Sequence, residues 1–276
     1  MPWTVFFASA KPVALPLRQT FSLTVYNGNP AGAEHIVSTL LQAYCREHME
    51  LFIVRRNFNS IYADGSDLLQ QLQAQTKVTL FEQDKETGLQ ELFERLMAIM
   101  GERMQLRNEF VQQNGLTRGD PQNTVRAFEY IHAHSTPLMV IFENYYEFAK
   151  SLYDGQAVMF AELFRAQDPN TTSKKNNGYG YNIYYTACFG PGEYTLTAAQ
   201  TPMADCFNPQ KFTLMFGGQL DKCGAVPLPR DYLAINEPDE HYNHCVMYYQ
   251  GRLAGLSLPC GELVHVEPDP DEVPII

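Results

Sequence analysis

One segment of the sequence has the layout of a phosphate-binding loop but lacks the residues that bind phosphate. The apolar run at 21–27 precedes GNPAGAEHIVSTLL at 28–41, and together they predict a strand, a glycine-containing loop and an amphipathic helix. A working loop of this kind closes on Gly, Lys and Ser or Thr, where Lys binds the terminal phosphates and the hydroxyl binds Mg²⁺. Those three positions are Ala33, Glu34 and His35 in this chain.

Several positions of this loop oppose phosphate binding. Pro30 has no N–H to donate, and Glu34 would place a negative charge beside the phosphates. Two like charges about 4 Å apart repel by about 4 kcal/mol at an effective dielectric near 20, whereas a helix dipole offers only about 0.3–1 kcal/mol. Taken alone, the segment is best explained as an ordinary strand-to-helix turn. The residues of this degenerate loop are Gly28, Asn29, Pro30, Ala31, Gly32, Ala33, Glu34 and His35.

A second candidate site follows the near-continuous apolar run at 137–145, which predicts a strand buried on both faces. Nucleotide hydrolases end such a strand with Asp, which supports Mg²⁺, often followed by Glu, which activates water. If Glu143 takes the Asp place, Asn144 stands where the base belongs and accepts no proton at neutral pH. If Glu143 is the base, Phe142 occupies the metal position. Both alignments lose one required group.

A metal site is the main rival among enzyme-like alternatives. HYNHC supplies His241, His244 and Cys245, with Cys223 or Cys260 as further ligands. Zinc favours such residue types, but one cluster without a paired C-x-x-C is a weak signal. We therefore interpret this segment as a polar turn entering a strand, and we predict no metal site.

Two further groups of residues have structural explanations. The histidines of HAH at 132–134 are expected in a water-facing loop before a strand. Cys188 raises the alternative of a thiol nucleophile, but a buried position at an apolar strand end is the preferred interpretation. The aromatic residues around 143–148 and 181–186 alternate as strand residues do, so most are assigned to the core.

These candidate residues lie on alternating strand and helix signals. The alternation predicts an α/β fold with a mostly parallel sheet, whose strand ends place 28–35 and 143–144 at one edge. The turn Gln250-Gly251 predicts a closing hairpin at 244–259. The other expected strands are 51–56, 77–81, 181–189 and 211–216, the other expected helices lie near 89–112 and 156–166, and 168–180 is expected to be an exposed loop.

Composition limits the classes of function. The 276 residues include 20 basic and 31 acidic side chains, a net charge of −11, which disfavours a nucleic-acid partner. The six cysteines are scattered, as expected for thiols in a reducing compartment. The chain shows neither a signal peptide nor an apolar run of the ~20 residues that a membrane helix needs. It is expected to be soluble and cytoplasmic, either by itself or as a piece of a longer membrane protein.

The order of these segments resembles the FtsK/SpoIIIE class of RecA-like motor ATPases, most closely the C-terminal ATPase-like domains of EssC-type proteins of type VII secretion systems. Cys188 stands where active relatives carry a Gln that senses the γ-phosphate. The resembling segments are an Arg-containing helix at 92–110, the strand at 137–148, the strand at 180–194, a late strand at 212–229 and a closing hairpin at 246–259.

The resemblance implies a RecA-like three-layer sandwich over residues 1–262, followed by an acidic, Pro-rich tail at 263–276. It implies a degenerate catalytic centre at Glu143, Asn144 and Cys188, with ATP and Mg²⁺ suggested by the family alone. The implied role is a protein-interaction module for small helical secretion substrates or adjacent ATPase domains, at the cytoplasmic face of the bacterial membrane through a longer parent chain.

The alternative is a weakly nucleotide-binding or active ATPase or DNA translocase. That alternative requires a basic side chain from elsewhere to reach the phosphates. The candidates are Arg55, Arg56 and Arg252.

Overall fold

The structure is a computed structural model of the chain. It describes residues 5–8, 11–14, 17–29, 33–56, 59–116, 121–165, 181–197, 203, 206–207, 209–238 and 244–257.

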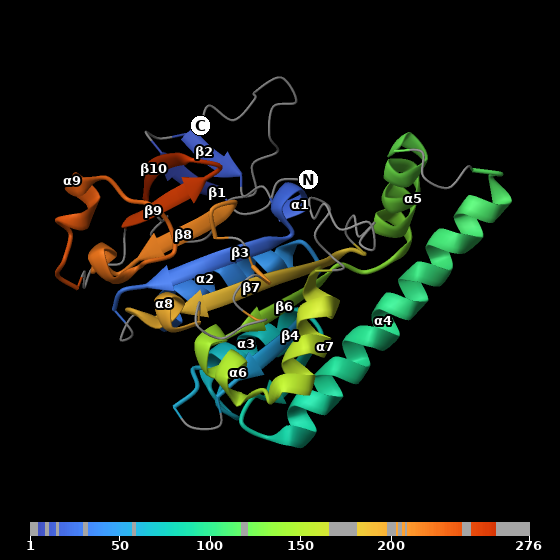
Figure 1. The fold of residues 1–276 in the computed structure, drawn as a ribbon, viewed down its shortest axis with the longest axis horizontal. Coiled ribbons are helices and arrows are strands. Elements are labelled where there is room, and N and C mark those ends of the chain that lie inside the picture. Colours follow the sequence, from blue (N-terminus) through green and yellow to red (C-terminus); the bar gives the residue numbers. More distant parts are fainter. Residues whose placement is uncertain are drawn as a thin grey trace.

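In this part of the chain a ten-stranded sheet forms the centre of the molecule, in the order β2-β1-β10-β9-β8-β3-β7-β6-β4-β5 (Figure 1). Neighbouring strands from β8 to β5 are all parallel, whereas β9, β10, β1 and β2 extend the sheet with antiparallel pairs. The strands are β1 (Val5–Ala8), β2 (Lys11–Ala14), β3 (Ser22–Asn27), β4 (Glu50–Arg55), β5 (Val78–Glu82), β6 (Leu138–Phe142), β7 (Ile183–Phe189), β8 (Phe212–Phe216), β9 (His244–Tyr249) and β10 (Arg252–Ser257).

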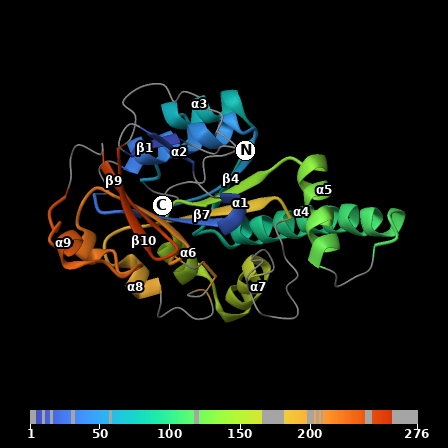
Figure 2. The ribbon, with the colours of Figure 1, turned by 90° about the horizontal axis from the view of Figure 1, so that it is seen from above.

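Helices cover both faces of the parallel part of the sheet (Figure 2). Helices α2 and α3 pack on one face, and α4, α5, α6 and α7 contribute to the core on the other. The helices are α1 (Leu17–Thr20), α2 (Ala33–Arg46), α3 (Asp67–Gln75), α4 (Glu86–Gln113), α5 (Pro121–His134), α6 (Tyr145–Ser151), α7 (Asp154–Arg165), α8 (Glu193–Thr197), the 3-10 helix η3 (Leu220–Lys222) and α9 (Arg230–Leu233). The expected three-layer α/β architecture is confirmed.

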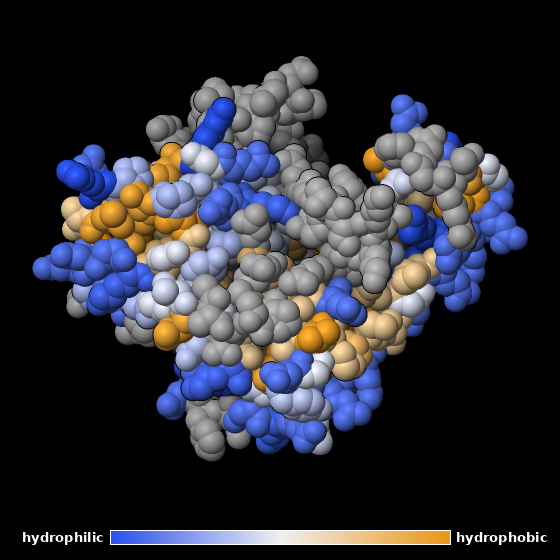
Figure 3. Space-filling view, in the orientation of Figure 1, coloured by the Kyte–Doolittle hydropathy of each residue, from blue (hydrophilic) through white to orange (hydrophobic). Residues whose placement is uncertain are grey.

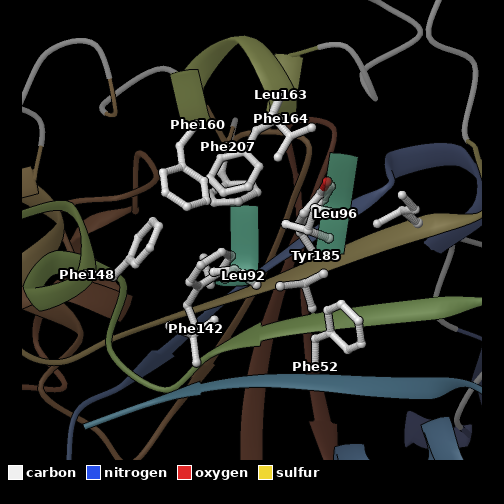
Figure 4. Close-up of a cluster of buried hydrophobic side chains, with 14 of the residues drawn as sticks. Phe52, Leu92, Leu96, Phe142, Phe148, Phe160, Leu163, Phe164, Tyr185 and Phe207 are labelled. Atoms are coloured by element: carbon white, nitrogen blue, oxygen red, sulfur yellow. The ribbon is translucent and has the colours of Figure 1, made fainter. Parts of the chain in front are cut away.

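Side chains of the central strands alternate between two hydrophobic clusters. Ile53 of β4 packs with α2 and α3, while Phe52 and Val54 pack with α4 and α7. All five residues of β6 are buried, as expected for a strand covered on both faces. The second cluster is rich in rings (Figure 4), among them Phe142, Phe148, Phe160, Phe164 and Phe207.

The elements predicted around the candidate site are confirmed. Residues 22–27 form a strand and residues 33–46 form a helix. The strand predicted at 137–145 is β6, although it ends at Phe142. The predicted hairpin is β9–β10, with its turn at Gln250 and Gly251.

Two local predictions were wrong. His132 and His134 lie in the last turn of α5, not in a loop, because Ala127, Phe128 and Ile131 supply a buried helical stripe ahead of them. The aromatic residues after Glu143 do not alternate on a strand, because Asn144 caps a helix there and places Tyr145 and Phe148 on the buried side of α6.

Other predictions fall outside the described residues. These are the exposed loop at 168–180 and the tail at 263–276. In the part of the chain that the structure describes, no helix is both long and apolar enough to cross a lipid bilayer.

Candidate functional site

The carboxyl ends of the parallel strands bring the predicted site residues to one edge of the sheet. Glu143 directly follows β6, and Cys188 is the last residue but one of β7. Phe142 pairs with Ala187, so Glu143 and Cys188 lie side by side at the next register position. Cys188 also pairs with Val25 of β3, which leads into the glycine loop. The topology therefore places Glu143, Cys188 and the start of the glycine loop at one edge of the sheet.

The described start of the glycine loop packs against the turn that follows β8. The N–H of Gly28 donates to the carbonyl of Phe216 at 2.8 Å, and the carbonyl of Gly28 accepts from Gln219 Nε2 at 2.9 Å. A Cβ added to Gly28 would lie 1.9 Å from the carbonyl oxygen of Gly218. Only glycine permits this approach, so the first glycine of the loop serves a backbone contact.

The turn at 217–219 has an unusual backbone that makes this contact. Gly217, Gly218 and Gln219 have φ values of 72°, 71° and 47°, all left-handed. The hydroxyl of Tyr26 donates to the carbonyl of Gln219 at 2.6 Å, and Lys222 Nζ donates to its Oε1 at 2.6 Å. Tyr26 thus fixes the backbone of Gln219 and Lys222 fixes its side-chain oxygen. The amide Nε2 of the same side chain donates to Gly28 in the glycine loop.

The remaining loop positions are described in part. Pro30, Ala31 and Gly32 lie outside the described residues. Ala33, Glu34 and His35 form the first turn of α2, and the structure describes their backbone alone.

Glu143 is held by the chain itself. Its Oε2 accepts the N–H of Arg56 and its Oε1 accepts the N–H of Ile61, each at 2.9 Å. The side chain is 5% exposed, and the guanidinium of Arg56 lies 3.9 Å from it. The carboxylate therefore fastens the loop between β4 and α3 to the end of β6.

Asn144 links the next two elements. Its Oδ1 accepts the N–H of Glu147 at 2.9 Å and caps α6. Its Nδ2 donates to Glu193 Oε1 at 2.8 Å, and Glu193 Oε2 accepts the N–H of Gly190. The carboxylate of Glu193 thus joins the end of β6 to the loop after β7.

The Cys188 thiol is protonated at neutral pH. Burial raises its pKa to about 12, with contributions from the nearby carboxylates of Glu143 and Glu193. A nucleophilic cysteine needs a lowered pKa, so this environment is opposed to thiol chemistry. Tyr62, fully buried beside these groups, also has a pKa raised by burial.

The basic side chains considered for phosphate binding are placed differently. Arg55 donates to the carbonyl of Tyr62 at 2.6 Å and to Asp64 at 2.9 Å, and it lies 3.5 Å from Glu82. Arg56 is 43% exposed beside Glu143. Arg252 begins β10, five positions along the sheet from β6, and is not part of this edge.

The rival metal cluster is described in part. His241 and Cys260 lie outside the described residues. Cys223 is buried after η3 and Cys245 is buried on β9. Within the described ranges, no three His, Cys, Asp or Glu side chains are grouped as a metal ion requires.

Two residues of the site escaped the sequence analysis. Glu193 follows the turn Pro191-Gly192 and opens α8, so its acidic character at a helix start was a usable signal. Gln219 lies 191 residues from its partner Gly28, and no local pattern predicts that contact.

The sheet order and the helices on both faces define an α/β fold with a mostly parallel central sheet. No protein-family model matches the sequence, and no curated protein matches it. Among solved structures, the chain is similar to EssC (ATPases 2 and 3) from Geobacillus thermodenitrificans, with a TM-score of 0.61 and 11% identity over 94% of this chain and 40% of that one.

Two further solved structures share the fold. EccC (ATPases 2 and 3) of Thermomonospora curvata, in complex with a signal sequence peptide, gives a TM-score of 0.58 and 12% identity over 95% of this chain and 40% of that one. The pCW3 conjugation coupling protein TcpA, in its monomer form with ATPgS, gives a TM-score of 0.59 and 11% identity over 92% of this chain and 64% of that one. The chain therefore has the fold of these FtsK/SpoIIIE-type domains, and it spans about 40% of the EssC and EccC structures.

Proposed function

We propose that this chain is a catalytically degenerate ATPase-like domain of a type VII secretion motor and acts as a protein-interaction module. Its partners would be the helical export signals of small secreted proteins, or adjacent ATPase domains of a longer parent chain. That parent chain would hold the domain at the cytoplasmic face of the bacterial membrane.

The observation that carries this proposal is the hydrogen bonding at the strand ends. Both carboxylate oxygens of Glu143 accept backbone N–H groups, and Asn144 is engaged with Glu147 and Glu193. A general base must reach the water that it activates, and Asn144 has no basic group to offer. These side chains stabilise the fold where catalysis would need them free.

ATP and Mg²⁺, which the fold implies, find little support among the described residues. The carbonyl of Gly28 is occupied by Gln219 and its Cα is covered by Gly218. Glu34 and His35 replace the Lys and hydroxyl residue of a working loop. We therefore expect no ATP hydrolysis by this domain.

The relatives supply the partner class. EccC of Thermomonospora curvata is a type VII secretion ATPase, and one of its solved structures contains a signal sequence peptide. A domain with this fold that lacks catalytic groups can still function by binding such a peptide or a neighbouring domain.

A paired binding experiment tests the proposal. Labelled C-terminal signal peptides from small secreted proteins of the same locus are titrated with the purified chain, with and without Mg·ATP, and ATP turnover is measured in parallel. We expect peptide binding that nucleotide does not change, and no turnover. ATP hydrolysis that disappears in Glu143→Gln would instead establish the active-ATPase alternative.

A double variant distinguishes the effect of charge on nucleotide affinity from the effect of the backbone geometry of the glycine loop. Glu34→Lys with His35→Thr removes the repulsion of phosphate and restores the hydroxyl. We expect nucleotide affinity to rise if charge is the main obstacle. Unchanged affinity would assign the loss to backbone geometry, including Pro30.

A further inference from the structure

Exposed apolar side chains gather on α4 and its neighbours. Nine large hydrophobic residues are exposed in the part of the chain that the structure describes. Three of them lie on α8, α9 or the residues just after α9. The other six belong to α4, α5, α7 or the turn before α7: Met97, Met104, Val125, Tyr153, Val158 and Met159.

Two helices combine part of this group into one surface. Met97, Gly101 and Met104 follow one another at helical spacing along α4, and they lie on the same side of that helix. Val158 and Met159 are 49% and 47% exposed on α7. The two helices touch through Phe93 and Phe160, whose ring centroids are 5.4 Å apart. Figure 3 shows hydrophobic colour over α7 that continues as a pale stripe along α4.

Contacts within this chain do not require glycine at position 101 of α4. A glycine within a helix costs about 1 kcal/mol relative to alanine. A Cβ at Gly101 would meet no atom within 4 Å. The gap beside the two methionines thus leaves room for another backbone to approach α4 closely.

Acidic side chains, here called the acidic row, are exposed on the same two helices. Three of them stand about one helical turn from a residue of the surface: Glu94 precedes Met97 by three positions, and Asp154 and Glu162 lie four positions on either side of Val158. Glu94, Glu102 and Glu109 are exposed along α4, and Asp154 and Glu162 are exposed on α7. Glu94 and Glu109 accept hydrogen bonds from the neutral side chains of Gln90 and Gln105. None of the five acidic residues forms an ion pair within the described residues.

We propose that this surface, formed by Met97, Gly101, Met104, Val158 and Met159, binds an amphipathic helix of a partner protein that carries a basic flank. The apolar stripe of such a helix would pack on the methionines, which adapt their shape to a partner. Its Lys and Arg residues would face the acidic row. The surface uses none of the strand-end residues, so the inference does not depend on the proposed function.

Designed peptides test the chemistry directly. Three fluorescent 18-residue helical probes are compared by anisotropy: one with a leucine stripe and lysine flanks, one with the same stripe and glutamate flanks, and one lysine-containing scramble without a stripe. We expect the chain to bind the first probe and to bind the other two at least about tenfold more weakly.

Matched variants locate the site. Met97→Asp with Met159→Asp should weaken binding of the basic probe by about tenfold or more. The control, Leu233→Asp with Ile235→Asp, changes two other exposed apolar residues and should stay within about twofold. Hydrogen exchange on adding the probe should slow at 94–108 and 154–162, and thermal melts establish that both variants fold.

Four results would overturn the inference. The first is equal loss of binding in both double variants, and the second is equal binding of the scrambled probe. The third is no binding of the basic probe. The fourth is a concentration-dependent dimer that the Met97 and Met159 changes abolish, which would assign the surface to a second copy of this chain.

Discussion

The carboxylate of Glu143, at the end of β6, accepts hydrogen bonds from two backbone N–H groups of the segment after β4. Glu143→Ala removes the acceptor of two backbone N–H groups, those of Arg56 and Ile61. Leaving two partly buried donors without partners costs about 2 kcal/mol or more. Urea unfolding should show this loss. The control Glu147→Ala removes a half-exposed carboxylate paired only with Lys150, and it should change stability by less than about 1 kcal/mol.

Glu143→Gln refines the same prediction. The amide keeps one oxygen acceptor but turns an N–H₂ group toward a second donor, so the loss should be intermediate. A Glu143→Ala protein as stable as the parent would contradict the structural role of this carboxylate.

Gly28 is expected to tolerate no side chain. Gly28→Ala would place Cβ 1.9 Å from the Gly218 carbonyl oxygen, and the atoms that this Cβ would meet are all backbone atoms of Gly217 and Gly218. Relief requires a shift of the loop or of the turn after β8, at a cost of about 3 kcal/mol. Thermal unfolding measures the loss. A melting temperature unchanged by Gly28→Ala would show that the two turns are not packed together.

Cys188 should be unreactive in the folded protein. Burial raises its pKa to about 12, so the thiolate, which is the form that attacks iodoacetamide and displaces iodide, is scarce at pH 8. We expect alkylation of Cys188, mapped by mass spectrometry, to need urea. Rapid alkylation of the native protein at that pH would mean a lowered pKa.

The same pKa shift gives a dependence of stability on pH. The folded pKa is raised, so the contribution of the thiol is complete below the unfolded pKa and is lost as pH rises toward 12. The stability difference between the parent chain and Cys188→Ala should therefore shrink above about pH 9. A constant difference between pH 8 and pH 10 would contradict this expectation.

At the scale of elements, alanine substitutions at two glycines distinguish the effect of helix propensity on stability from the effect of a left-handed backbone. Gly101 lies within α4 with open space around it, and Gly192 has open space but a φ of 77°. Gly101→Ala should stabilise the fold by about 0.5–1 kcal/mol. Gly192→Ala should destabilise it by about 1 kcal/mol or more, because alanine disfavours a left-handed backbone. The same sign for both variants, measured by urea unfolding, would refute this distinction.

The strands and helices that carry the site were predictable because their patterns are local. The strand at 22–27 and the helix at 33–46 follow from apolar periodicity and a glycine turn. Helix α5 was missed because its stripe is short and mixed with polar residues, although Ala127, Phe128 and Ile131 are buried. Strands β1 and β2 are four residues each, below the length at which alternation is distinctive.

The contacts that close the site were not predictable from the sequence. Gln219 and Gly28 are separated by 191 residues, and Asn144 and Glu193 by 49. The order of the strands in the sheet determines which distant residues become hydrogen-bond partners, and local sequence patterns do not predict that order. Sequence reasoning singled out Glu143 and Asn144 as candidate site residues, but it did not predict that their side chains hold neighbouring loops together.

At the scale of the whole molecule, the fold is one that ATPase domains share, but the net charge of the chain disfavours a nucleic-acid partner. The parallel strands β8 to β5 and their helices form a fold that motor ATPases share. The net charge of −11 opposes the phosphate backbone that a translocase must hold. The active alternative, a DNA translocase domain, therefore makes a distinct prediction about salt.

A duplex titration at several salt concentrations tests that alternative. Each phosphate neutralised by Lys or Arg contributes about 0.9 to the slope of log affinity against log salt. With 20 basic and 31 acidic residues, we expect weak duplex binding at low salt and a slope too small for several phosphate contacts. Burial of apolar surface is little screened, so a helix contact should lose much less affinity over the same range than a duplex whose phosphates are neutralised by several Lys or Arg side chains. Tight duplex binding with a steep slope, without peptide binding at any salt concentration, would replace the interaction module with a translocase fragment.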